Sequence, residues 1–265
     1  MTFLSDYGTD DEFAGVCHAV IAGIAPAATV IDLTHGIARH AVAQGARVLA
    51  NALPYTPAGV HLAVVDPGVG SPRRAVAVRV SDADRVLVGP DNGLLWAAIE
   101  RFGGAVEAVD VSRSGFRLEP ISATFHGRDI FAPVAAHLAL GAALAEAGEL
   151  IAPESLTALE GSRPEIEPGR VIAHVVSVDR YGNLALDVGE SRLPETGLRL
   201  GRRLGIDARG KEHDAVFTLT FADVAAGELI LYEDAYRNLA LAVNRGSAAE
   251  ALALGAGDEL VLRPE

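Results

Sequence analysis

Hydrophobic and polar positions follow two different patterns along the chain, and the pattern changes near residue 155. Before that point, short β-branched runs alternate with alanine-rich stretches of helical periodicity. The β-branched runs predict strands at 29–33, 60–65, 75–80 and 85–88. The alanine-rich stretches predict helices at 11–24, 40–52, 93–102 and 129–144. This alternation is typical of an α/β domain with a mostly parallel central sheet, whose ligands gather at the carboxyl ends of the strands.

The segment from Pro153 to Arg170 is polar and proline-bearing, and helical periodicity nearly vanishes after it. Strand-like runs separated by Gly, Asn and Asp turns follow it: VIAHVVSVDRYGNLALDV, LRLGRRLGIDA, AVFTLTF, GELILYED and DELVLRPE. We therefore predict an N-terminal α/β domain at 1–155, a linker at 156–169, and a smaller all-β domain at 170–265. The second domain is expected to be a small barrel or sandwich.

Composition narrows the possible partners of the 265-residue chain. Half of the residues are hydrophobic and 22% are charged, as in soluble globular proteins. A formal net charge of −13 would repel a phosphate backbone, so we expect no nucleic-acid partner. The single cysteine, Cys17, cannot form an intrachain disulfide and is expected in the core. No signal-peptide pattern and no apolar run of roughly 18 residues occurs, which predicts a cytoplasmic protein without a membrane partner.

Acidic residues gather at the start of the chain, in the motif SDYGTDD. Asp6, Asp10 and Asp11 come where a first strand would meet a first helix. Carboxylates at that point could accept two ribose hydroxyls or pair with an ammonium group. They could equally cap the helix and favour its dipole, and the spacing does not separate the two roles.

Two further motifs contain groups suited to catalysis. In HLAVVDPGVGSPRRAVAV, a buried-looking strand ends at Asp66, and Arg73 follows the tight turn PGVG. Such a pair could hold and polarise a small nucleophile, although a hairpin turn with solvated charges gives the same pattern. In ATFHGRDIFAP, His126, Arg128 and Asp129 stand at the entrance to a helix, where they could also form a cap and an ion pair.

Other polar clusters are most simply turns. Asp91, Asn92 and Gly93 in GPDNGLLW precede a predicted helix, and Asp179 and Asn183 in VDRYGNLALDV could form a hairpin.

Several common sites are not indicated by the sequence. The eight histidines show none of the paired spacings that place two metal ligands on one face, so we predict no metal site. The motifs GxGxxG, GxxxxGKS and GxSxG do not occur, which argues against the usual dinucleotide, nucleoside triphosphate and acyl-enzyme sites.

Taken in order, six blocks resemble the S-adenosylmethionine hydroxide adenosyltransferases, which are relatives of the fluorinase and chlorinase. The blocks are SDYGTDD, VVDPGVGSPRR, GPDNGLL, TFHGRDIFAP, VDRYGN and AVNRGSAA, and they run nearly end to end. The resemblance implies an N-terminal α/β domain, a C-terminal β-barrel, and a homotrimer that binds its small-molecule substrate between neighbouring subunits. It also implies hydrolysis of S-adenosyl-L-methionine to adenosine and methionine without a metal or redox cofactor.

The family pattern implies two groups of site residues. The catalytic group would surround the attacking water and comprises Asp66, Arg73 and His126. In the substrate-binding group, Asp6 would hold the ribose, and Asp11 and Asp179 would hold the methionine part. Asn183 and the segment around Asn244 would face the adenine.

The identity of the nucleophile depends on Asp66. Halogenating relatives have an aromatic residue there, whereas an ionised carboxylate would repel a halide in a poorly solvated pocket. Attack at the ribose C5′ expels a neutral thioether, so the leaving group needs no proton. We expect Asp66 to orient water, Arg73 to fix Asp66 and weaken it as a base, and His126 to relay or accept the proton. A chlorinase-like halogenase and a non-catalytic sensor of adenosyl ligands are the alternatives.

One segment departs from the family pattern. Where relatives carry an Asn-Ser stretch followed by glycine, this chain has Asp234, Ala235 and Arg237. Because the resemblance places the amino-acid end of the substrate there, we expect an altered methionine pocket around 233–238.

Overall fold

In the computed structural model, which describes residues 1–82, 84–159 and 161–265, the chain forms two compact units, Met1–Glu160 and Gly161–Glu265. The boundary falls inside the predicted linker 156–169. Strand β8 (Glu165–Glu167) also lies in that segment and pairs with the second unit's sheet, so part of the predicted linker is ordered as strand. Among the described residues, no helix is long and apolar enough to cross a membrane.

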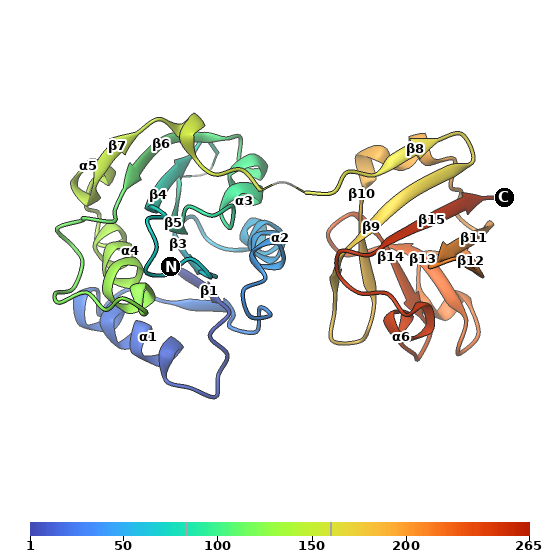
Figure 1. Cartoon of the computed structure of the whole chain (residues 1–265), viewed down its shortest axis with the longest axis horizontal. Helices are drawn as coiled ribbons and strands as arrows, with labels where there is room; N and C mark the ends of the chain where they lie inside the picture. The colour runs from blue at the N-terminus through green and yellow to red at the C-terminus, as the bar shows by residue number, and fades with distance from the viewer. Residues whose placement is uncertain (83, 160) are drawn as a thin grey trace. The chain divides into compact units, whose positions relative to one another are not determined.

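The described residues of the first unit form a seven-stranded sheet in the order β2-β1-β3-β5-β4-β6-β7 (Figure 1). Its strands are β1 (Thr2–Ser5), β2 (Ile31–Thr34), β3 (Gly59–Val64), β4 (Ala75–Val80), β5 (Arg85–Pro90), β6 (Ala105–Asp110) and β7 (Glu149–Ile151). Strands β2, β1, β3 and β5 are mutually parallel, and β4, β6 and β7 continue the sheet in antiparallel pairings. The predicted α/β class and parallel-rich sheet are confirmed.

Helices cover both faces of this sheet because its strands present apolar side chains alternately to each face. On β3, Leu62 and Val64 face one core, whereas Ala63 on the same strand and Val65 directly after it face the other. Helix α1 packs beside α4, and α2 packs beside α3. The helices are α1 (Phe13–Ile24), α2 (Val42–Ala52), α3 (Trp96–Arg101), α4 (Ala132–Ala139) and α5 (Leu144–Ala147).

The helix predicted at 129–144 is divided into three parts. A π-helical turn, Gly127–Phe131, precedes α4, and Gly141 then adopts a φ of +96° before α5 begins. A left-handed backbone suits glycine and ends the helix there. The structure also contains β6 and β7, which the sequence pattern did not predict.

Residues 161–265 form a closed β-barrel of seven strands, in which β9 pairs with both β10 and β15. Around the ring the order is β9-β10-β14-β13-β12-β11-β15, and β8 extends it from β9. The strands are β9 (Arg170–Val178), β10 (Leu184–Gly189), β11 (Arg203–Ala208), β12 (Lys211–Phe217), β13 (Leu229–Glu233), β14 (Asn238–Val243) and β15 (Glu259–Pro264), and α6 (Ala248–Leu252) follows β14. The barrel-like second domain is therefore confirmed.

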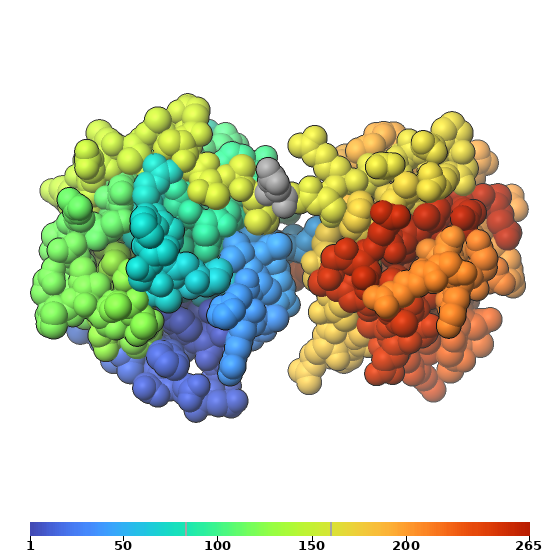
Figure 2. All heavy atoms as spheres, viewed as in Figure 1, coloured from blue at the N-terminus to red at the C-terminus, as the bar shows by residue number. Residues whose placement is uncertain are grey.

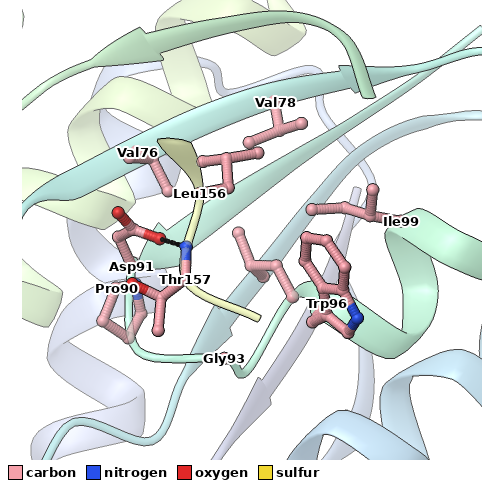
Figure 3. A pocket seen from close by; sticks show the side chains of 10 residues that line it. Val76, Val78, Pro90, Asp91, Gly93, Trp96, Ile99, Leu156 and Thr157 are labelled. Atoms are coloured by element: carbon pink, nitrogen blue, oxygen red, sulfur yellow. Dashed lines mark hydrogen bonds between the residues drawn. The ribbon is translucent and has the colours of Figure 1, made fainter. Parts of the chain in front are cut away.

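The last residues of the first unit are fastened to its surface. Figure 2 shows the segment after residue 149, in yellow-green, on the outside of this unit. Leu156 points into an apolar site beside Trp96 and Val78, and Asp91 Oδ1 accepts a 2.7 Å hydrogen bond from Thr157 N (Figure 3). The cavity left around these side chains is only about 10 Å³. The Asp91 turn therefore anchors the chain where the first unit ends.

We expect Leu156→Ala to lower the free energy of unfolding of the first unit by about 2–4 kcal/mol, because Leu156 is buried and its loss leaves a void. The measurement is urea unfolding followed by Trp96 fluorescence, since Trp96 is the only tryptophan of the chain. Leu219→Ala is the control, because Leu219 is 76% exposed and its loss should cost under about 0.5 kcal/mol. An unchanged transition in Leu156→Ala would show that the anchor contributes nothing.

Candidate active site

A pocket of about 270 Å³ lies within the first unit, where the carboxyl ends of β1 and β3 meet the loop before the π-helical turn. Its lining residues are Asp6, Tyr7, Asp11, Phe13, Arg39, His40, Val64, Asp66, Val69, Thr124, Phe125, His126 and Gly127. Four residues predicted for the site are among them: Asp6, Asp11, Asp66 and His126. The pocket occupies the sheet edge at which ligands are expected in an α/β fold.

Parallel pairing brings the two aspartates to this edge. Ser5 pairs with Val64, so Asp6 and Asp66 follow the ends of adjacent strands. Asp6 Oδ2 accepts a 3.0 Å hydrogen bond from His40 N, which fixes the carboxylate against the loop after β2. Asp11 also lines the pocket, whereas its neighbour Asp10 lies outside the lining, and both are exposed.

Asp66, Arg73 and His126 form one contiguous cluster. Arg73 Nε donates to Asp66 Oδ1 at 2.8 Å, and Arg73 Nη2 donates to Asp66 Oδ2, so the guanidinium holds the carboxylate with two bonds. The side chains of Asp66 and Arg73 are only 6% and 11% exposed. A surface ion pair is common and contributes little, whereas two charged side chains shielded from water persist only where their hydrogen bonds are satisfied. This shielded pair therefore indicates a functional site more strongly than a solvated surface pair would.

The arginine also fixes the tautomer of His126. Arg73 Nη2 lies 3.2 Å from His126 Nδ1, and a guanidinium can only donate. Nδ1 of a neutral His126 is therefore the acceptor, and Nε2 has the proton. Burial lowers the pKa of His126 below 6.5, and the Arg73 charge lowers it further against the opposing effects of Asp66 and Asp129. The ring is neutral at neutral pH.

Two glycines allow the close approach of the surrounding loops. Gly70 in the turn after Asp66 has a φ of +79°, and a Cβ there would lie 2.6 Å from the Ala123 carbonyl oxygen. A Cβ on Gly127 would lie 2.0 Å from the Tyr7 hydroxyl. Both positions are incompatible with a side chain, which explains why glycine follows Asp66 and His126 in these motifs.

The rest of the third motif organises the loop beside the pocket. Asp129 is 1% exposed, forms a 2.6 Å ion pair with Arg128, and accepts a 2.8 Å hydrogen bond from Ser122 N. The alternative reading of Arg128 and Asp129 as an ion pair is thus correct for these two residues. Neither of them lines the pocket.

Asn92 supports the site from the GPDNGLLW turn. Its Nδ2 donates to the carbonyl of Val65 at 2.9 Å, and its Oδ1 accepts from Leu94 N at 3.1 Å. Val65 directly precedes Asp66, so this turn holds the backbone from which the Asp66 carboxylate projects.

Sequence reasoning missed the aromatic wall of the pocket. Tyr7 and Phe125 meet edge to face at 5.8 Å, and Phe13 and Phe125 meet at 5.0 Å. Burial, and then nearby carboxylates and Cys17, raise the pKa of the Tyr7 hydroxyl, which therefore stays protonated. A signal was present, because Tyr7 adjoins Asp6 and Phe125 adjoins His126, but isolated aromatic residues are usually assigned to the core.

The remaining predicted residues belong to the second unit. Asp179 Oδ1 accepts hydrogen bonds from Tyr181 N and Asn183 N at 2.8 and 2.9 Å, and its Oδ2 accepts from Asn183 Nδ2 at 2.8 Å. The hairpin alternative is therefore correct locally, while a carboxylate with about four lone-pair positions keeps one for a ligand. Asn244 follows β14, whose end pairs with the start of β10 just after this turn.

Residues 233–238, the segment that departs from the family pattern, form the same kind of turn. Asp234 Oδ1 accepts from Tyr236 N at 2.8 Å and from Asn238 N at 2.9 Å, matching the pattern around Asp179. Arg237 takes the left-handed position with a φ of +66° and pairs with Glu233 at 2.9 Å. Burial, followed by the charges of Asp179 and Asp234, raises the pKa of Tyr232 to about 12. Both turns thus present a carboxylate within electrostatic range of one tyrosine.

Comparisons with known proteins agree with this architecture. Residues 1–148 match the model of the SAM hydroxide adenosyltransferase N-terminal domain, and residues 173–261 match that of its C-terminal domain. The chain is 46% identical over 260 residues to a protein of Salinispora tropica named (R)-S-adenosyl-L-methionine hydrolase, covering 98% of this chain and 96% of the relative. It is 28% identical over 283 residues to a fluorinase of an Actinoplanes species, with 97% and 95% coverage.

A solved structure extends the comparison to the fold. A crystal structure of an uncharacterized conserved protein from Thermotoga maritima superimposes with a TM-score of 0.92 at 35% identity, covering 99% of both chains. Both domain models match in order and together span most of the sequence. The chain belongs to the SAM hydroxide adenosyltransferase family.

Proposed function

We propose that this enzyme hydrolyses S-adenosyl-L-methionine to adenosine and L-methionine, by in-line attack of water on the ribose C5′. Its relatives bear the name (R)-S-adenosyl-L-methionine hydrolase, and we extend to this chain their preference for the R sulfonium. The observation that supports the reaction best is the Asp66–Arg73–His126 cluster in a pocket that also contains Asp6 and Asp11.

The pocket suits a cationic adenosyl substrate. Asp6, Asp11 and Asp66 supply negative charge, and the rings of Tyr7 and Phe125 supply aromatic surface. A sulfonium is attracted to carboxylates and to the faces of aromatic rings. Asp6, whose Oδ2 is already held by His40 N, accepts the ribose hydroxyls, and Asp11 takes part in binding the methionine ammonium.

Water is a better nucleophile here than a halide. The carboxylate of Asp66 accepts a hydrogen bond from water, whereas it offers a halide only like charge. Arg73 neutralises the charge of the pair, but its guanidinium is directed at Asp66 and His126, so it is not free to bind a halide. The aromatic residue that the resemblance gives to the halogenating relatives would remove this acceptor.

The direction of proton transfer follows from the tautomer that the contact with Arg73 favours in His126. Nδ1 of His126 is occupied by Arg73, so its protonated Nε2 donates a hydrogen bond instead of removing a proton. Asp66 accepts the proton, and its pairing with Arg73 is no obstacle, because the protonated 5′-alcohol formed by attack of water is a strong acid. His126 therefore orients the water and Asp66 receives its proton.

The leaving group is a neutral thioether, which departs without acid or Lewis-acid assistance. We propose on this chemical ground that the reaction requires no cofactor and no metal.

In the second unit, Asp179 binds the methionine part, and Asn183 and the segment around Asn244 face the adenine. Asp234, through its place near Tyr232, adds negative charge for the methionine ammonium.

We also propose that the enzyme is a homotrimer with its site at the subunit interface, as the family resemblance implies. Sedimentation velocity should give a mass three times 27.5 kDa, and a monomeric species at enzyme-assay concentrations would contradict this. The cytoplasmic location stays a prediction from the sequence.

Replacing Asp66 by Asn should lower kcat by about 10²–10⁴-fold with a small change in KM, because the amide keeps the shape but cannot take the proton. The measurement is chromatography of nucleoside products from purified, metal-stripped enzyme, with and without chloride. Asp214→Asn, an exposed position on β12, is the matched control and should turn over normally.

The products distinguish the competing functions. Adenosine and methionine in both conditions, lost in Asp66→Asn, are expected for the hydrolase. A 5′-chlorinated nucleoside would establish the halogenase instead, and tight binding without product would establish the sensor.

The histidine tautomer gives a separate prediction. His126 should titrate below 6.5, and Arg73→Gln should raise its pKa because a lowering charge is removed. Asp66→Asn should lower it further, because a raising charge is lost. NMR of the ring Cε1–H resonances measures both shifts, and His213 in the second unit is an internal reference. A His126 pKa unchanged by Arg73→Gln would contradict the contact, and activity should fall as pH decreases through the measured value.

A further inference from the structure

Two histidines and an aspartate outside the lining of the active-site pocket converge on one point. His18 lies on α1, Asp32 on β2, and His35 directly after β2. His18 and His35 are 17 residues apart, and the sequence-based prediction of no metal site rested only on the spacings between histidines. The fold brings them together because α1 packs over the strand pair that contains Asp32.

An irregularity in β2 aligns two of these groups. Phe3 of β1 pairs with Asp32, but the next residue, Leu4, pairs with Thr34, so β2 contains one extra residue. In a regular strand, residues three apart face opposite sides of the sheet. The extra residue reverses this relation, as a bulge does, and Asp32 and His35 face the same side.

The donor atoms lie close to the separations that a metal ion requires. His18 Nε2 lies 2.8 Å and His35 Nε2 lies 3.2 Å from the same oxygen, Asp32 Oδ1. One donor atom from each residue lies within 4.8 Å of the others. Ligands bound to Zn²⁺ at about 2.0–2.1 Å stand roughly 3–3.4 Å apart, so only the two imidazoles would need to move closer.

His35 supplies an independent indication. It is 91% buried, its side chain is 7% exposed, and Nε2 has no hydrogen-bond partner among the described residues despite its distance to Asp32. The ring is nevertheless firmly placed, because Nδ1 lies 2.7 Å from Ser5 Oγ and the Phe3 ring packs against it at 4.7 Å. A buried imidazole nitrogen without a partner is costly unless a ligand uses its lone pair.

We propose that His18, Asp32 and His35 bind a divalent transition-metal ion of the zinc class. Two imidazoles and one carboxylate are typical of such sites, and the second ring nitrogen of a ligating histidine usually donates to an oxygen acceptor that fixes the ring. Ser5 Oγ provides that support for His35. Asp32 and His18 are 45% and 33% exposed, so the ion enters from solvent and water completes its coordination.

The metal would stabilise the segment that contains Asp6. Ser5 Oγ contacts His35 Nδ1 and also accepts from Tyr7 N at 3.2 Å, and Gly8 N donates to the His35 carbonyl at 2.8 Å. Fixing His35 therefore fixes the backbone of residues 5–8. The ion acts on structure and takes no part in the attack on C5′.

The test uses the full-length, chelator-stripped protein and calorimetric titration with ZnCl₂, repeated with CoCl₂ to record visible absorption. We expect one saturable site per chain, cobalt bands of histidine coordination, and a higher thermal unfolding midpoint with zinc. His18→Gln and Asp32→Asn should each weaken zinc binding at least about tenfold. Both residues are partly exposed, so these variants should fold, and circular dichroism checks it.

His213→Gln is the matched control, because His213 lies on β12 in the barrel, and its zinc affinity should equal that of the unchanged protein. The proposal is overturned if no saturable binding occurs, or if His18→Gln and Asp32→Asn bind zinc as tightly as the control. Because binding is measured without S-adenosylmethionine, the result is independent of whether the enzyme hydrolyses that substrate.

Discussion

The parallel pairing of β1 with β3 is the constraint on which the site depends. It places Asp6 and Asp66 after equivalent ends of neighbouring strands, at one edge of the sheet. If one of these strands shifted by one residue against the other, all of its side chains would move to the opposite face of the sheet. The two aspartates would then no longer line a common pocket. The same pairing continues through β1 to β2, where one extra residue directs Asp32 and His35 toward α1.

At this edge, electrostatics decide the chemistry. Asp66 and Arg73 are both shielded from solvent, and removal of one partner would leave an uncompensated charge. The pair persists because two hydrogen bonds and the contact with His126 satisfy it. The cation of Arg73 also lies 5.1 Å from the centre of the Phe131 ring, so the π-helical turn supports the cluster from below. In the proposed reaction, a carboxylate held in this way orients the attacking water.

Much of the fold followed from hydrophobic patterning, because strands at 60–65 and 75–80 and the helices flanking them have clear periods. Strands β6 and β14 were missed because AVEAVD and NLALAV are rich in Ala, Glu and Leu, which favour helices when isolated. Pairing of β6 with β4, and of β14 with β10 and β13, overrides that local preference.

The site, like the fold, was predictable only in part, because tertiary packing decides what local sequence does not. Asp6, Asp66, Arg73 and His126 stand in recognisable motifs, and the structure brings them together. The aromatic wall of Tyr7, Phe13 and Phe125, and the convergence of His18 with Asp32 and His35, depend on tertiary packing between segments far apart in sequence. No local spacing contains that information.

The most direct test of the central claim, that water positioned by Asp66 attacks C5′, is a single-turnover reaction in H₂¹⁸O analysed by mass spectrometry. The account predicts one ¹⁸O atom in the 5′-hydroxyl of adenosine and none in methionine. Adenosine without the label would contradict attack by water at C5′.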